Sequence, residues 1–182
     1  MNRDAAEIQS TREILLDAFG RVAEELPDLL AGLTPEGLLW QPDPQANSIA
    51  WLSWHLSRVA DDHLAGVGEV EQVWRTGGWR ARFALPYDES DIGYGQSAAD
   101  VSRFAVTDVD LLTGYHADVH RLTTEVVNRL GPADLHRIVD RRWNPPVTAA
   151  VRLVSVVNDT TQHLGQIAYL RGMLERGAAT PR

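Results

Sequence analysis

Cysteine is absent from the chain, and so are clusters of basic residues and long apolar runs. Without cysteine there are no disulfides and no thiolate metal ligands, which fits a reducing cytoplasm. The N-terminal segment lacks the pattern of a signal peptide, which is a positively charged start followed by an apolar stretch. No run approaches the roughly 18 apolar residues of a membrane span. We therefore expect a cytoplasmic protein that does not enter a membrane.

The net charge of −8 argues against nucleic acid as a partner. Nucleic-acid binding depends on clustered lysine and arginine, whereas the basic residues here are scattered. The length of 182 residues is typical of one domain and is sufficient for a hydrophobic core without disulfides. We expect a single domain, residues 1–182. Six tryptophans are many for this length, and an exposed aromatic patch among them would favour a homodimer.

Four long segments have the apolar period of helices. They span about 5–25, 49–66, 108–130 and 147–177. Pro27 is expected to kink or stop the first helix, Ser48 to cap the second, and Thr107 to cap the third before Gly131 stops it. With no repeat or low-complexity tract between them, these segments predict an all-α protein with the architecture of a four-helix bundle.

Residues 66–100 form a long insertion between the second and third helices and show no sustained period. Structureless insertions of this length are uncommon in a compact domain and tend to be functional. The segment is rich in aromatic residues, namely Trp74, Trp79, Phe83, Tyr87 and Tyr94. These side chains either line the mouth of a pocket or a partner surface, or they fix a long loop on the bundle.

Asp159 and His163 are four residues apart in the last helix. On an α-helix their side chains share a face, about 40° apart in rotation and roughly 6 Å apart along the axis, which suits two ligands of one cation. The segment around them is the most apolar long stretch of the chain. An ionised carboxylate in such surroundings costs several kcal/mol unless it is paired or metal-bound. Asp159 therefore needs a partner.

His55 shares a mainly apolar face of the second helix with Trp51 and Val59, so its imidazole is expected to point inward. A lone inward histidine is usually a core residue with one hydrogen bond. Here Asp159 and His163 also require a third partner, and bundle metal sites are built from inward side chains on facing helices. We predict a metal site formed by His55, Asp159 and His163.

The third helix holds a second pair at metal spacing, His116 and His120. Neutral histidines tolerate burial far better than a carboxylate does, so this pair has less need of a cation. We regard it as the weaker metal site, with His120 the nearer of the two to the main one.

Three polar residues are candidates to orient a metal ligand or a substrate: Gln166, Asp62 and His120. Gln166 lies about one turn beyond the histidine of the last helix, and Asp62 lies two turns along the second helix. Ordinary packing roles are the alternative for each. Arg58 is expected in solvent, with contact to a substrate carboxylate as the alternative, and His63 is expected to be exposed or at an edge.

Three segments resemble the DinB-like superfamily, most closely its branch of mycothiol-dependent transferases and maleylpyruvate isomerases. They are 48–55, 143–146 and 159–166. The resemblance implies a four-helix bundle with up-down-down-up connections and a divalent metal, usually zinc, held by one histidine of helix two and two ligands of helix four. These positions correspond here to His55, Asp159 and His163. The chain departs from its relatives at Asp159, where they have histidine or the longer glutamate.

Three protein ligands leave a tetrahedral zinc with one open position, the pattern of a catalytic site. A metal with an open position deprotonates a coordinated thiol or lowers the pKa of a bound water. Because the chain lacks cysteine, a sulfur nucleophile must come from outside, and the resemblance implies a low-molecular-weight thiol of the mycothiol type. We predict a zinc-dependent S-transferase that conjugates this thiol to small electrophiles, with detoxification as its expected role.

Two other classes remain open. Activation of water would make the protein a metal-dependent hydrolase, and two histidines with one carboxylate also describe the facial triad of non-haem iron oxygenases. The third possibility is a non-enzymatic metal-binding stress-response protein. Completion of the metal shell by His116 or His120 would favour this last class, because a saturated site has no place for substrate.

Overall fold

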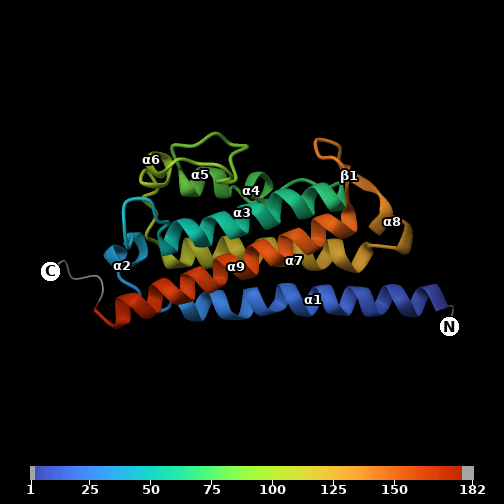
Figure 1. Ribbon diagram of the computed structural model, residues 1–182, viewed down its shortest axis with the longest axis horizontal. Coiled ribbons are helices and arrows are strands. Elements are labelled where there is room, and N and C mark those ends of the chain that lie inside the picture. The colour runs from blue at the N-terminus through green and yellow to red at the C-terminus, as the bar shows by residue number, and fades with distance from the viewer. Residues whose placement is uncertain (1–2, 178–182) are drawn as a thin grey trace.

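The computed structural model describes residues 3–177 of the chain. Four long helices form its bundle: α1 (Arg3–Leu30), α3 (Ile49–Gly68), α7 (Val109–Arg129) and α9 (Ala149–Glu175). α3 and α7 run in one direction, and α1 and α9 run in the opposite direction (Figure 1). The predicted all-α four-helix bundle with up-down-down-up connections is therefore confirmed.

Short elements connect the long helices. They are α2 (Pro35–Leu39), α4 (Val73–Thr76), α5 (Trp79–Phe83), α6 (Ala98–Val101), α8 (Pro132–His136), β1 (Ile138–Asp140) and β2 (Val147–Thr148). β1 and β2 pair as a small antiparallel hairpin that leads into α9. Within residues 3–177, no helix combines the length and apolar character needed to cross a bilayer.

Capping residues set where the helices of the bundle begin. Ser48 caps α3 as predicted, because its side-chain oxygen accepts a hydrogen bond from the backbone N–H of Trp51. The predicted cap of α7 is wrong by one residue. Asp108, not Thr107, accepts the hydrogen bond from the N–H of Leu111, at 3.0 Å. The carboxylate also complements the positive end of the helix dipole.

α1 neither stops nor restarts at Pro27 but continues as one helix to Leu30. The guanidinium of Arg171 of α9 donates to two carbonyl oxygens in the last turn of α1, those of Asp28 and Leu29, and to that of Ala31 just beyond it, at 2.8–3.0 Å. A cation at this position also offsets the negative end of the helix dipole. The tertiary contact thus extends the helix beyond its proline.

α3 is the most deeply buried of the helices. It packs against α7 and α9, while the short helices α4 to α6 lie over its remaining side (Figure 1). Every residue from 49 to 61 is buried, including Arg58, whose exposed fraction is 0%. The expectation of a solvated Arg58 is wrong because the segment between α3 and α7 covers the face on which it lies.

That segment, residues 69–108, is fixed on the bundle by its aromatic side chains. Trp74, Trp79, Phe83 and Tyr87 are all buried. Trp74 and Phe83 pack against the ring of Tyr115 of α7, with centroids 5.2 and 5.6 Å away. Tyr94 differs from the others in being 80% exposed. Most of the predicted aromatic group therefore anchors the loop, and Tyr94 alone of the five remains at the surface.

Candidate metal centre

His55 of α3 meets Asp159 and His163 of α9 where the two antiparallel helices face each other. One ligand atom from each side chain lies within 4.8 Å of the other two. The rings of His55 and His163 are 4.8 Å apart between centroids, and Nε2 of His163 is 3.5 Å from Oδ1 of Asp159. The structure thus brings together the three side chains that the sequence selects, close enough to share one cation after small rotations.

The ring of His55 is held in the orientation that a metal ligand needs. Its Nδ1–H donates to the backbone carbonyl of Ile92, which leaves the lone pair of Nε2 free. The indole of Trp51 stacks on the imidazole, with centroids 4.7 Å apart and planes 17° apart. Burial lowers the pKa of His55, against the opposing effect of the bond to Ile92. The neutral imidazole is the form that binds metals.

His163 is oriented in the same way by a residue of its own helix. Its Nδ1–H donates to Oε1 of Gln166 at 2.8 Å, so Nε2 faces Asp159. Burial lowers the pKa of His163, but the hydrogen bonds to Asp159 and Gln166 outweigh burial and raise it. The structure therefore places Gln166, one of the predicted orienting residues, in contact with a predicted ligand.

The environment of Asp159 tests whether a cation fits between the three side chains. Its side chain is 33% exposed, so the carboxylate lies at a wall of the bundle and is not enclosed in the core. Yet its Oδ2 atom is buried and has no hydrogen-bond partner among the described residues. A buried carboxylate oxygen without a partner is costly, and a cation removes that cost. Two imidazole nitrogens and one carboxylate form a donor set that suits zinc.

Gly93 allows the loop to approach the His55 ring. Its φ is +88°, and a Cβ at this position would lie 2.6 Å from Nδ1 of His55. Asp91 closes the loop by accepting hydrogen bonds from the N–H of Gly93 and the side chain of Gln96, at 2.7 and 2.8 Å. Gln96 in turn accepts from Nε1 of Trp51 at 2.9 Å. Residues 91–96 thus hold both the ring and its stacking partner.

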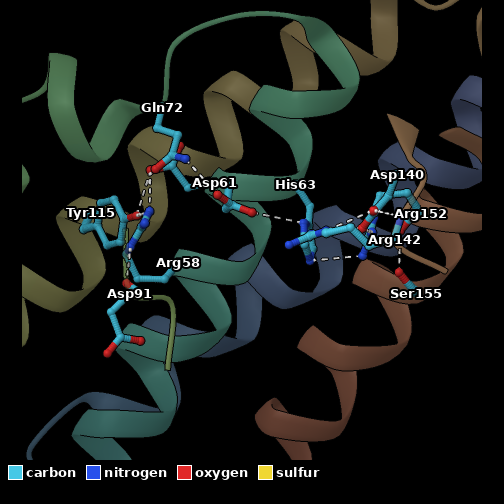
Figure 2. A network of polar contacts seen from close by, with 11 residues as sticks. Arg58, Asp61, His63, Gln72, Asp91, Tyr115, Asp140, Arg142, Arg152 and Ser155 are labelled. Atoms are coloured by element: carbon cyan, nitrogen blue, oxygen red, sulfur yellow. Dashed lines mark hydrogen bonds and ion pairs between the residues drawn. The ribbon is translucent and has the colours of Figure 1, made fainter. Parts of the chain in front are cut away.

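A buried ion pair of α3, Arg58 with Asp61, anchors this loop (Figure 2). Arg58 donates through Nε to the backbone oxygen of Asp91 at 3.4 Å, and its NH1 group lies 3.3 Å from Oδ2 of Asp61. Asp61 also accepts from the hydroxyl of Tyr115 at 2.8 Å. Its remaining donors are the backbone N–H groups of Val73 and Trp74, at 2.9 and 2.8 Å. The network ties α3, α4 and α7 to the carbonyl next to Ile92.

Three other predicted residues have their contacts elsewhere. His116 is buried, with Nδ1 bonded to Ser57 at 3.0 Å, and burial lowers its pKa to about 4. With His120 it lines a small cavity in the bundle core. Asp62 accepts from Gln72 at 2.8 Å. Within the part of the chain that the structure describes, the candidate metal ligands form one cluster, and these three residues are outside it.

A cavity of about 800 Å³ opens beside the cluster. Asp159 forms part of its lining, and so do Ile92 and Tyr94 of the loop. Its other side is formed by the β1–β2 hairpin and the start of α9, including Arg142, Trp143 and Arg152. The sequence marks residues 143–146 only through the family resemblance and does not indicate that the hairpin side chains line a cavity. The only signal was the proximity of two basic residues to an aromatic one.

Comparisons with known proteins agree with this architecture. The model of a family described as the DinB superfamily matches residues 18–167. A crystal structure of a conserved protein from Enterococcus faecalis is 29% identical in sequence and has a TM-score of 0.82, with 91% of this chain and 96% of that chain covered. No curated protein matches the chain.

Proposed function

Because this chain belongs to the DinB superfamily, we propose that its clustered histidines and aspartate hold a divalent metal for catalysis. The proposed activity is that of a metal-dependent S-transferase. It uses zinc and a low-molecular-weight thiol of the mycothiol type, and it acts on small electrophiles. The observation that carries the proposal is the unpaired, buried Oδ2 of Asp159 at the wall of a cavity of substrate size.

In this proposal His55, Asp159 and His163 bind the metal, and Ile92 and Gln166 orient the two histidines. When bound, the metal would supply a Lewis acid that stabilises a thiolate at neutral pH. His55 and His163 present Nε2 because their Nδ1 atoms donate to Ile92 and Gln166. Asp159 contributes a negative charge that offsets part of the charge of the cation. The open cavity beside the carboxylate leaves room for a thiol and its acceptor.

The proposed reaction balances without a further reagent. The thiol loses its proton to solvent, and the thiolate sulfur attacks an electrophilic carbon to form a C–S bond. A leaving group departs with the bonding electron pair, or a conjugated π bond takes the pair and is then protonated. The protein has no cysteine of its own to compete with the added thiol.

One feature favours an enzyme over the non-enzymatic alternative, whereas the hydrolase must be separated by experiment. A non-enzymatic metal site would be saturated by protein ligands, but His116 bonds to Ser57 and lies outside the cluster. A hydrolase would use the same ligands with water, so the two enzymes differ in the nucleophile and not in the site. Addition of a thiol to the assay therefore separates them.

The test begins with elemental analysis of protein purified without chelator, followed by a conjugation assay with a thiol and chlorodinitrobenzene. We expect about one zinc per chain, and thiol-dependent product formation that falls at least 100-fold in His163→Ala. His136→Ala is the matched control, because His136 is an exposed histidine of α8, outside the cluster. Equal rates for wild type and His163→Ala would exclude the proposed role. Hydrolysis without thiol would favour the hydrolase.

A further inference from the structure

The cavity beside the metal cluster has a second polar end. His63, Asp140, Arg142 and Arg152 gather at this end, where Arg152 of α9 contacts both His63 and Asp140 and Arg142 also contacts Asp140 (Figure 2). NH1 of Arg152 lies 3.3 Å from Nε2 of His63, and its NH2 group donates to Oδ2 of Asp140 at 2.8 Å. Because arginine has no hydrogen-bond acceptor, Nε2 of His63 is the acceptor in this contact. Nδ1 of His63 lies 3.2 Å from Oδ2 of Asp62.

Asp140 orients the second arginine toward the cavity. Its carboxylate accepts from the backbone N–H and Nε of Arg142 through Oδ1, at 2.9 and 3.1 Å, and from NH2 through Oδ2 at 3.0 Å. Asp140 is buried, whereas the side chain of Arg142 is 85% exposed. Two of the five N–H groups of the Arg142 guanidinium are used in this fork. Its outer edge remains available for a second planar anion.

The carboxylates of the cavity are already engaged. Asp140 binds the two arginines, Asp62 accepts a hydrogen bond from Gln72, and Asp91 accepts one from Gln96. Asp159 faces the metal in the proposed function. The accessible charge at the hairpin end is therefore the guanidinium of Arg142.

The two ends of the cavity are separated by a definite length. Arg152 precedes Asp159 by seven residues on α9, which corresponds to about 10 Å along the helix axis. Between and around them the lining includes two exposed aromatic side chains, Tyr94 and Trp143, which are 80% and 57% exposed. A ligand that reaches from the cluster to the hairpin therefore passes apolar surface and ends at a cation.

We propose that Arg142, held in place by Asp140 and Arg152, binds a carboxylate of the substrate or cosubstrate. The inference rests on the proposed function. It assigns to the ligand a thiol or electrophile at one end, an apolar middle and a carboxylate at the hairpin end, with the separation of about 10 Å between Arg152 and Asp159 as the guide to its length. Arg142 is the binding residue, and Arg152 is a positioning residue that acts through Asp140.

The test uses three linear probes of equal length that differ only in their terminal group. They are ω-mercaptooctanoic acid, ω-mercaptooctanol and ω-aminooctanethiol, whose chain of about eight carbons spans about 10 Å. Binding to the zinc protein is measured by calorimetry, and thiolate coordination is followed in the cobalt-substituted protein by its charge-transfer absorption. We expect the acid to bind about tenfold more tightly than the alcohol, and the amine to bind most weakly.

Substitutions identify the group that produces this preference. In Arg142→Ala the acid should lose its tenfold advantage, while the affinity for the alcohol stays unchanged. Arg141→Ala is the matched control, since Arg141 is an exposed arginine of the same hairpin. Arg152→Ala should reduce the preference, because Asp140 then loses one of the two cations that orient it.

Metal-free protein separates this inference from the proposed function. Octanoate and octanol are compared on it by NMR titration, with and without the Arg142→Ala substitution. If no probe coordinates metal but octanoate binds in an Arg142-dependent way, the transferase proposal fails and the carboxylate site stands. If all three thiols coordinate with equal affinity, or the amine binds best, the carboxylate site is excluded and the metal chemistry stands.

Discussion

The backbone carbonyl of Ile92 accepts the Nδ1–H of His55, so a loop residue sets which nitrogen of a candidate metal ligand is free. Ile92 lies 37 positions after His55, in the segment that covers α3. Hydrogen bonds of this kind fix the tautomer and ring orientation of metal-ligating histidines. The covering segment is therefore part of the site, although it contributes no ligand to the cluster.

Substitution of Gly93 tests this relationship. In Gly93→Ala the new Cβ would lie 2.6 Å from Nδ1 of His55 and 2.9 Å from Trp51, so the ring must move. We expect zinc affinity, measured by competition with a chromophoric chelator, to fall about tenfold or more. Gly95→Ala is the matched control. Gly95 also has a positive φ, +74°, but a Cβ there meets nothing within 4 Å.

Both alanine substitutions strain the backbone by about 1–2 kcal/mol, because each residue has a positive φ. Thermal unfolding measures this shared cost. A fall in zinc affinity of the same size in both variants would show that backbone strain, and not the displacement of His55, is responsible.

Gln166 is expected to raise the affinity of the site for zinc by orienting the ring of His163. Gln166→Ala removes the acceptor of the His163 Nδ1–H, which the structure places at 2.8 Å. We expect zinc affinity to fall about tenfold, and Gln166→Glu to restore it because a carboxylate oxygen accepts the same proton. Gln162→Ala, at an exposed position on the same helix, serves as the control. Failure of the glutamate to rescue binding would argue for a packing role.

The ion pair of Arg58 and Asp61 should support both stability and metal binding. Asp61→Ala leaves a buried guanidinium without its carboxylate, which costs about 3–5 kcal/mol of unfolding free energy. Zinc affinity should fall as well, because Arg58 holds the backbone of Asp91 beside Ile92. Urea denaturation and zinc titration measure the two effects.

Asp17→Ala is the control for this ion pair, because Asp17 belongs to an exposed pair with Arg21 on α1. It should change the free energy of unfolding little. Lower stability of Asp61→Ala with unchanged zinc affinity would show that the buried network does not act on the site.

The buried His116 predicts a pH dependence of stability. Burial lowers the pKa of His116 to about 4 in the folded protein, against an ordinary value near 6.5 when unfolded. Between these values the unfolded chain binds a proton that the folded chain does not, so stability falls as the pH decreases. The loss from this residue should be about 2 kcal/mol near pH 5.

Urea denaturation of metal-free protein at about pH 7 and pH 5 measures this effect. His116→Leu should remove that part of the pH dependence, although the variant also removes the His116 contact of Ser57, which keeps its hydrogen bond to the Ser53 carbonyl. The two proteins are therefore compared by the change in unfolding free energy between the two pH values, and not by its absolute size. An unchanged slope would contradict the predicted titration.

The cluster of candidate metal ligands is predictable from the sequence because its geometry follows from helix periodicity. A four-residue spacing places Asp159 and His163 on one face, and the apolar face of the second helix directs His55 inward. Packing of α3 against α9 then brings the three together. The remaining constraint on the prediction is that a buried carboxylate needs a partner. In the structure, Oδ2 of Asp159 has no hydrogen-bond partner among the described residues.

The rest of the site depends on contacts without a period. Ile92 and Gly93 lie in a loop whose path is set by Asp91 and by aromatic anchors distant in the sequence, so no local pattern indicates it. The prediction of a solvated Arg58 follows the usual exposure of arginine and is wrong here. The sequence does contain a contrary signal, because α3 has few charged residues in its first three turns, which is typical of a helix covered on all sides.

The dependence of His55 on the covering segment has an evolutionary consequence. In the proposed function, changes in residues 91–96 would alter the electrophilicity of the metal while His55, Asp159 and His163 stayed the same. Paralogues with identical chelators could thus diverge in reactivity. Ligand identity alone would then be a poor guide to annotation, and the geometry of this loop would be the better character to compare.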